Sequence, residues 1–283
     1  ITLMLANNEI GTLHPVKEIG VVAHERGVIF HCDATQAVGK LPIDVQAMHM
    51  DLLSMSGHKL YAPKGIGALY VRRRNPVVQL AIQMHGGGHE RNMRSGTLNV
   101  PGIVALGKAC EIAATEMTDE WTKMLKLRDR LEKGLMSRIK YVKINGHPTE
   151  RLANTSNLSF AYAEAESIFM RARDIAVSSG SACTSATLKH SYVLDAIGVS
   201  PAMANCSLRI SMGRFNDEAD IDYAVEKIAG SVQMSRDLNP DYETHLRLGI
   251  LDENNPDTWM PSEEKCKSLC SDKLCCRLKN LTD

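Results

Sequence analysis

The chain has 283 residues, and its 33 Lys+Arg residues balance its 33 Asp+Glu residues, so the formal net charge at neutral pH is zero. Apolar residues make up 44% and charged residues 23%, which are the proportions of a globular protein and exclude a disordered or fibrous chain. Zero net charge excludes the long-range attraction expected of a general nucleic-acid or anionic-membrane binder, and no window approaches the roughly 18 consecutive apolar residues of a membrane span.

Over the first 110 residues, short apolar runs alternate with helical periodicity. Pro15 opens a predicted helix over residues 16–26, and Gly27 ends it. Buried strands are predicted at residues 1–5, 28–32, 51–56 and 67–71. Strands that alternate with helices favour a mostly parallel sheet with covered faces, in which functional residues collect where strands end.

From Pro101 onward the pattern turns helical, with long amphipathic stretches over residues 103–117 and 121–139. After Asn145-Gly146 it becomes α+β. The expected elements there are strands at residues 156–160, 175–177 and 207–211 and helices at residues 166–173 and 218–234. Periodicity fades beyond Asn239-Pro240.

At about 100–200 residues per domain, the length fits one large domain or two ordinary ones. The patterns predict a large α/β domain over residues 1–115 and a smaller α+β domain with a connecting helix over residues 116–240. An irregular, Cys-rich tail is expected over residues 241–283. The chain starts at Ile1 rather than at a methionine, so we expect a processed or incomplete form of a longer chain.

The eight cysteines fall into two groups. Four are scattered and look like thiols of a reducing compartment: Cys32, Cys110, Cys183 and Cys206. Four crowd the C-terminal end: Cys266, Cys270, Cys275 and Cys276. The terminal spacing C-x3-C-x4-C-C leaves a metal knuckle or disulfides open, but it matches no standard zinc pattern and no histidine lies near it. We therefore expect no metal site.

Two predicted strands end in residues that suit one cofactor. Asp33 ends the strand over residues 28–32, and Lys59 follows the next strand. An aspartate and a lysine at adjacent strand ends are the pair that a pyridoxal phosphate (PLP) site requires. The lysine binds the aldehyde as an imine, and the aspartate keeps the pyridine nitrogen protonated. Alternatively, Lys59 is a solvated charge and Asp33 caps a following helix.

A glycine-rich segment, His85-Gly86-Gly87-Gly88-His89-Glu90, precedes Arg94-Ser95-Gly96-Thr97. Glycines, hydroxyls and an arginine suit an anionic phosphate, because backbone N–H groups can approach it closely. The same glycines also fit a mobile connection without a ligand.

Cys183 lies in a segment of small residues over 178–186. A buried structural cysteine normally sits among Val, Leu or Ile, so this setting favours an exposed, mobile and usable thiol. A passive cysteine in a small-residue turn is the alternative.

Eight segments taken together, covering about residues 1 to 240, closely resemble the NifS/IscS-type cysteine desulfurases, which are fold-type-I PLP enzymes of the class V aminotransferase family. In chain order these are Asn7-Asn8-Glu9-Ile10-Gly11, Asp33-Ala34-Thr35-Gln36, Ser56-Gly57-His58-Lys59, Pro63-Lys64-Gly65, residues 85–91, Arg94-Ser95-Gly96-Thr97, residues 178–186 and Ser207-Leu208-Arg209. The resemblance implies a mostly parallel sheet in a large PLP-binding domain, followed by a smaller α+β domain.

The resemblance also implies a role for each matching residue. Lys59 would carry PLP, Asp33 would pair with the ring nitrogen, and Gln36 would bond the ring hydroxyl. Ser56 and His58 would hold the phosphate, and Thr97 would reach the phosphate of the neighbouring subunit in a homodimer. Asn8 and Arg209 would bind the substrate carboxylate, a task that suits a planar guanidinium.

Cys183 would be the nucleophile that takes sulfur from L-cysteine, leaving alanine and a persulfide. The family passes this sulfur to iron–sulfur scaffold proteins or to tRNA thiolation, so we expect a sulfur-acceptor protein as partner and no direct contact with nucleic acid or membrane. The resemblance implies that the protein acts in the bacterial cytoplasm, with the mitochondrial matrix as the alternative.

The family's N-terminal part has no counterpart before Ile1, so the resemblance implies an N-terminally truncated chain that binds PLP poorly in isolation. Two other readings stay open. A selenocysteine lyase or another class V enzyme would share Asp33 and Lys59 but would not need Cys183. A truncated homologue without catalysis would act as a dimerising or binding module.

Overall fold

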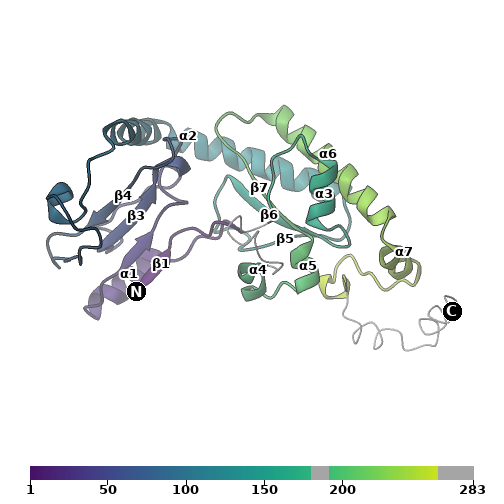
Figure 1. Ribbon diagram of the computed structural model, residues 1–283. Helices are drawn as coiled ribbons and strands as arrows, with labels where there is room; N and C mark the ends of the chain where they lie inside the picture. The colour runs from purple at the N-terminus through teal and green to yellow at the C-terminus, as the bar shows by residue number, and fades with distance from the viewer. Residues whose placement is uncertain (180–190, 261–283) are drawn as a thin grey trace. The chain divides into compact units, whose positions relative to one another are not determined.

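The structure is a computed structural model that describes residues 1–179 and 191–260 (Figure 1). The chain forms two compact units. Unit 1 comprises Ile1–Leu125 and His147–Asn154, and unit 2 comprises Lys126–Gly146 and the described residues from Thr155 onward. The division falls within the long helix α2 (Val100–Arg138), ten residues later than the predicted boundary after residue 115.

The sheet of unit 1 has the strand order β1-β2-β3-β4 (Figure 1). Its strands are β1 (Thr2–Met4), β2 (His31–Asp33), β3 (Leu52–Ser56) and β4 (Gly67–Val71). The first three strands are parallel, and β4 pairs antiparallel with β3. The prediction of a mostly parallel sheet is therefore confirmed.

The second strand begins three residues later than the sequence predicted. Helix α1 (Val16–Glu25) ends in a turn in which the amide of Val28 donates to the carbonyl of Ala23 at 2.9 Å. Val28 is therefore engaged in the helix end, and strand pairing starts only at His31.

The core of unit 1 lies between the sheet and α1, and its fully buried side chains include Phe30, Cys32 and Met50. Gly20 of α1 permits close packing, because a Cβ atom there would lie 2.1 Å from the carbonyl oxygen of Met48.

A buried ion pair joins β4 to the parallel part of the sheet. Arg72 follows β4, and its Nε lies 3.0 Å from Oδ1 of Asp51, which directly precedes β3. The other carboxylate oxygen of Asp51 accepts from the amide of Phe30 at 2.9 Å, and the guanidinium of Arg72 also donates to the carbonyl of Met50. Both charged groups are thus bonded as well as paired, which is the condition under which a buried pair is tolerated.

Unit 2 contains the antiparallel sheet β5-β6-β7. Its strands are β5 (Val142–Ile144), β6 (Thr155–Phe160) and β7 (Ser207–Ser211). Leu158 and Leu208 pair on one face, and this face is turned toward α2 because Ser156, two residues from Leu158, donates its hydroxyl to Glu132 at 2.7 Å. The buried side chains of the opposite face are polar and include Asn157, Ser159 and Ser207.

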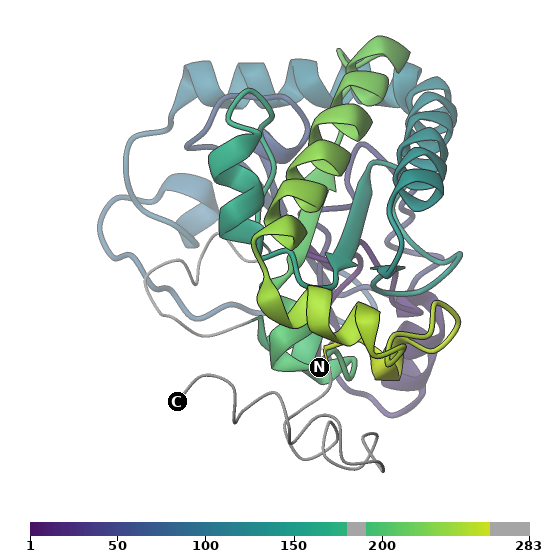
Figure 2. The ribbon, with the colours of Figure 1, turned by 90° about the vertical axis from the view of Figure 1, so that its right-hand side faces the viewer.

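The helices of unit 2 after β6 are α3 (Ala165–Arg171), α4 (Tyr192–Ala196), α5 (Pro201–Asn205), α6 (Glu218–Asp237) and α7 (Pro240–Arg247), followed by the short helix η3 (Pro256–Thr258). Helix α3 packs beside α6 (Figures 1 and 2), and α7 continues from the end of α6. Among the described residues, no helix is long and apolar enough to cross a membrane.

Several predicted elements differ from the structure. The two helices expected over residues 103–117 and 121–139 are one, because Thr118 and Asp119 do not cap a new helix. Instead, the carbonyl of Thr118 accepts from the hydroxyl of Thr122 inside α2. The strand expected over residues 175–177 is absent. Ile175 closes a turn onto Ala172, and Ser178 forms a bridge with β7.

The tail expected from residue 241 starts with a helix. Asn239 accepts from the amides of Asp241 and Tyr242, and Pro240 occupies the first turn, so α7 has both start signals of an ordinary helix. The terminal cysteines from Cys266 onward lie outside the described residues.

We predict that Asp51→Ala lowers the free energy of unfolding by about 3–5 kcal/mol, because it leaves the buried guanidinium of Arg72 without its counter-charge. Urea denaturation followed by circular dichroism measures this. As a control, Glu111→Ala removes an exposed ion pair with Lys108 and should cost less than about 1 kcal/mol. Equal effects of the two substitutions would contradict the prediction.

Candidate functional site

Asp33 and the end of β3 lie side by side at the carboxyl edge of the unit 1 sheet. Asp33 pairs with Ser54 in the parallel register of β2 and β3, and the amide of Ala34 donates to the carbonyl of Ser54 at 3.0 Å. The half-buried side chain of Asp33 accepts from the amide of Thr35 at 2.9 Å. This bond orients the carboxylate in a turn, so Asp33 does not start a helix.

The turn after β2 is tight. The amides of Ala37 and Val38 both donate to the carbonyl of Ala34, which brings Gln36 to the rim of the sheet as a half-buried side chain. Gln36 therefore follows Asp33 at the same edge.

Lys59 lies in the short helix η1 (Gly57–Lys59), directly after β3. The carbonyl of Gly57 accepts from the amides of Leu60 and Ala62, both at 3.0 Å, so the chain folds back tightly after Ser56. Gly57 is buried, and a Cβ atom there would lie 2.9 Å from Cγ2 of Ile66. The turn leaves the side chains of His58 and Lys59 exposed.

Thr97 belongs to the glycine-rich segment of the same unit and is exposed. This segment contains the short helix η2 (His89–Asn92) and depends on positive φ at Gly86 and Gly96. Among the described contacts, Thr97 has none with Asp33 or Lys59.

The two predicted carboxylate-binding residues lie in different units. Asn8 is half-buried in unit 1, in a turn made by the side chain of Asn7, which accepts from the amides of Glu9 and Ile10. Arg209 is half-buried on β7 in unit 2, and its backbone bonds that of Ser178.

The structure thus brings together five of the predicted residues at one edge of the unit 1 sheet: Asp33, Gln36, Ser56, His58 and Lys59. Asn8 lies in the turn that follows β1, whose last residue Met4 pairs with Asp33. Thr97 lies in the glycine-rich segment of unit 1, and Arg209 lies in unit 2. Cys183 lies outside the described residues.

Sequence reasoning missed two side chains near the candidate residues, one at the start of β2 and one in the turn that follows it. His31 places its Nε2 atom 3.2 Å from the hydroxyl oxygen of Ser54. Lys40 donates from Nζ to the carbonyls of Gln36 at 3.0 Å and Lys59 at 3.2 Å. Both bonds of Lys40 go to backbone carbonyls, so no side-chain pattern in the sequence signals them.

Two other cysteines are buried in cores. Burial raises the pKa of Cys32 to about 12, and the neighbouring charge of Asp33 adds to the shift. Burial also raises the pKa of Cys206 to about 12, with Glu164 as the next cause. Neither thiol forms a reactive thiolate near neutral pH.

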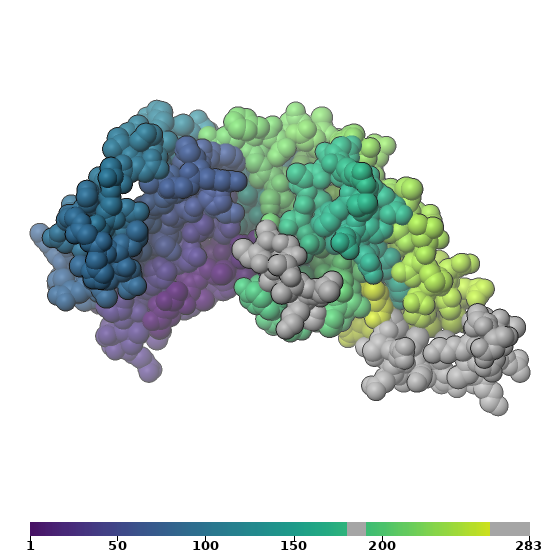
Figure 3. Space-filling model, in the orientation of Figure 1, coloured from purple at the N-terminus to yellow at the C-terminus, as the bar shows by residue number. Residues whose placement is uncertain are grey.

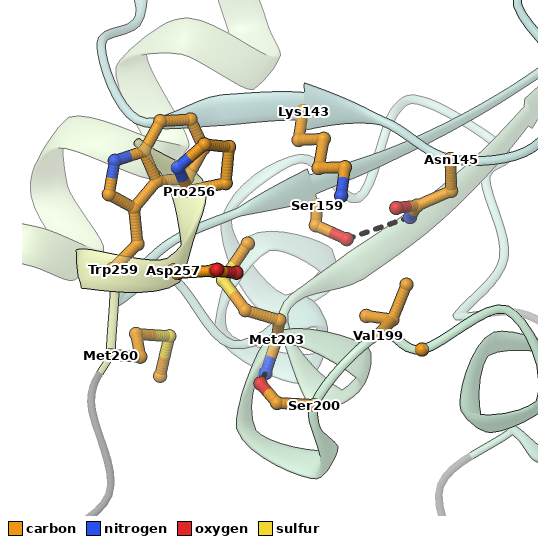
Figure 4. A pocket seen from close by; sticks show the side chains of 11 residues that line it. Lys143, Asn145, Ser159, Val199, Ser200, Met203, Pro256, Asp257, Trp259 and Met260 are labelled. Atoms are coloured by element: carbon orange, nitrogen blue, oxygen red, sulfur yellow. Dashed lines mark hydrogen bonds between the residues drawn. The ribbon is translucent and has the colours of Figure 1, made fainter. Parts of the chain in front are cut away.

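A cavity of about 250 Å³ lies within unit 2 and contains none of the predicted site residues (Figure 4). Asn145 and Ser159 line one side, and Met203 and Trp259 line another. Within residues 1–179 and 191–260, no group of three or more His, Cys, Asp or Glu side chains is arranged to hold a metal ion.

The comparisons define the family. The pattern of the aminotransferase class-V family matches residues 1–224, and the chain belongs to this family. It is similar to the cysteine desulfurase IscS of Anaeromyxobacter dehalogenans, with 52% identity over 243 residues, which are 86% of this chain and 60% of that relative. The IscS of Shewanella sp. (strain ANA-3) gives the same identity and coverage.

The solved structures agree. A NifS-like protein from Rickettsia africae matches with a TM-score of 0.75 and 31% identity, covering 82% of this chain and 61% of that one. The protein SspA, solved in complex with cysteine, matches with a TM-score of 0.63 and 37% identity, covering 77% of this chain and 59% of that one. The predicted family and its fold are therefore confirmed, and the chain spans about 60% of the length of the curated relatives it matches.

We predict that iodoacetamide at pH 8 leaves Cys32 and Cys206 unmodified in the native chain and alkylates both in urea, as measured by peptide mass spectrometry. Because folding raises the pKa of both thiols, the unfolded chain loses the thiol protons at a lower pH than the folded chain does. Stability should therefore fall between about pH 9 and pH 12, by up to about 1.4 kcal/mol per pH unit for each thiol. Native labelling of either thiol would contradict the burial argument.

Proposed function

We propose that this chain carries the PLP-binding lysine and the sulfur-carrying cysteine of a cysteine desulfurase. The enzyme removes sulfur from L-cysteine, releases L-alanine and holds the sulfur as a persulfide on Cys183. The observation that supports this most directly is the meeting of Asp33 and Lys59 at the ends of two adjacent parallel strands, in a chain 52% identical to a desulfurase.

The residues at this edge fit PLP by their chemistry. A carboxylate, a primary amine, an amide and two phosphate-binding side chains are supplied by Asp33, Lys59, Gln36, Ser56 and His58. Lys59 and His58 are exposed, so they are accessible to an incoming cofactor, while Asp33 is anchored by the amide of Thr35. When bound, PLP supplies an electron sink for the breaking of bonds at the substrate Cα.

Each side chain then has a defined task. Lys59 would hold the cofactor through its amine, and the same amine would move the proton from the Cα of L-cysteine. Asp33 would pair with the ring nitrogen of the cofactor and favour its protonated form. Asn8 and Arg209 hold the substrate carboxylate, and the guanidinium of Arg209 supplies two parallel N–H donors.

Cys183 performs the sulfur transfer. Its thiolate attacks the sulfur of L-cysteine, a new S–S bond forms, and the C–S bond breaks with its electron pair passing to the alanine carbon. A proton on that carbon completes L-alanine. The free thiol has a pKa of about 8.5, so the enzyme must stabilise the thiolate.

We further propose a homodimer in which Thr97 reaches the cofactor phosphate of the neighbouring subunit. The segment around Thr97 supports this, because several of its large apolar side chains are exposed: Val77, Ile82, Met84, Leu98, Val100, Ile103 and Val104. Figure 3 shows this blue-to-teal segment on the surface of unit 1. Exposed apolar side chains that are numerous in one segment favour a protein partner.

An iron–sulfur scaffold or another sulfur-acceptor protein would take the sulfur from Cys183. The proposal places this chemistry in the bacterial cytoplasm, with the mitochondrial matrix as the alternative.

The chain incubated with excess PLP should develop the visible absorbance of lysine-bound PLP and produce sulfide and alanine from L-cysteine. Lys59→Ala should abolish both. Cys183→Ala should keep the absorbance and lose the sulfide, because only the sulfur acceptor is removed. Sulfide production unaffected by Cys183→Ala would favour a selenocysteine lyase or another class V enzyme. Absence of the absorbance at any PLP concentration would contradict the proposal and favour a non-catalytic homologue.

Asp33→Asn should lower the rate of sulfide release by about 10- to 100-fold while PLP still attaches to Lys59, because a hydrogen bond to a charged group is worth about 1.5–3 kcal/mol. Asp44→Asn is the matched control. Asp44 makes the same kind of turn, accepting from the amide of Gln46 at 2.8 Å, but lies outside the candidate site. Equal rates of sulfide release for the two variants would show that Asp33 only stabilises its turn and would contradict its proposed role.

A further inference from the structure

Lys40 joins the two segments that carry the proposed PLP residues. Its Nζ donates to the carbonyl of Gln36, on its own turn, at 3.0 Å and to the carbonyl of Lys59, nineteen positions along the chain, at 3.2 Å. A single ammonium therefore bonds the backbones of both segments.

The neighbouring residue allows this approach. Gly39 has φ +75°, and a Cβ atom there would lie 3.2 Å from Cβ of Leu60 and 3.3 Å from Cβ of Ala113. Leu60 is buried in a small core with Ala62 and Ala109. The turn after β2 is thus packed directly on the residue that follows Lys59.

The position is unfavourable for an isolated charge. The pKa of Lys40 is lowered to about 8, mainly by burial and then by the positive charge of Lys59, while Glu120 opposes the shift. Lys40 is half-buried, and two carbonyl acceptors compensate for the part of its hydration that the ammonium loses. The ammonium therefore links two backbone segments by hydrogen bonds that an apolar side chain at position 40 would not make.

We propose that Lys40 is a positioning residue, which fixes the backbone of Gln36 and of Lys59 relative to each other so that the amine of Lys59 meets the cofactor aldehyde. The proposal rests on the proposed function, since it assumes that Lys59 is the PLP-binding residue. It assigns Lys40 no contact with the substrate.

Borohydride trapping tests the proposal without measuring activity. The full chain is incubated with a series of PLP concentrations, reduced and digested, and the pyridoxyl group is mapped by mass spectrometry. Half-maximal labelling of Lys59 in Lys40→Met should need about 10-fold more PLP than in the wild type, because two charge-assisted hydrogen bonds are lost. Lys40→Arg should recover part of the loss, since it keeps the charge and the donors.

Two controls separate positioning from general destabilisation. Lys17→Met removes an exposed lysine of α1 and should label like the wild type. In Lys40→Met, hydrogen exchange should accelerate at the amides of Leu60 and Ala62, which close the turn onto Gly57, and stay unchanged at Phe30 in the core. Faster exchange at all three amides would indicate unfolding and overturn the proposal.

The outcomes also separate this proposal from the proposed function. Equal PLP dependence in Lys40→Met and wild type would overturn the positioning role while leaving Lys59 as the PLP residue. Labelling of Lys40 itself in the wild type would overturn it as well, by making Lys40 the cofactor amine. Absence of label on Lys59 in the wild type would contradict the proposed function.

Discussion

The arrangement of the candidate site depends on the parallel pairing of β2 with β3. Their register pairs Asp33 with Ser54, so the two strands end at the same edge of the sheet and the turns that follow them begin side by side. A shift of one residue would turn every side chain of a strand to the other face and would remove Cys32 and Leu53 from the core. The ion pair of Asp51 and Arg72 holds this register from the opposite end of β3, where it also ties in β4.

Much of unit 1 could be predicted because its signals are local. Apolar runs that stop at Asp33 and Ser56 mark the strand ends, and Pro15 and Gly27 bracket α1. The errors arise where one residue type serves two purposes. Thr118 and Asp119 are residue types that often begin a helix, yet they lie inside α2. No helix end is present there for them to cap, and the carbonyl of Thr118 bonds within α2 instead.

The candidate residues were predicted from their types and order, while their geometry required the fold. The contact of Lys40 with the carbonyl of Lys59 crosses 19 positions and involves a backbone atom, so no side-chain pattern records it. The reactivity of Cys32 and Cys206 also could not be predicted from the sequence. The sequence presents them as free thiols like any other, and only their enclosure in two separate cores makes them inert. Arg209 and Asn8 belong to different units, and their common role remains a proposal.

The polar face of the unit 2 sheet has a consequence for how this protein can change. The amide of Asn145 donates to Asn157 and Ser159, both at 2.7 Å, and the hydroxyl of Ser159 lies 2.7 Å from that of Ser207. All four side chains are nearly or fully removed from water. Replacing any one of these side chains leaves a buried hydrogen-bond partner unsatisfied, which lowers stability more than replacing two bonded partners together. Across related sequences, these positions should therefore vary in concert, and single exchanges among them should be rare.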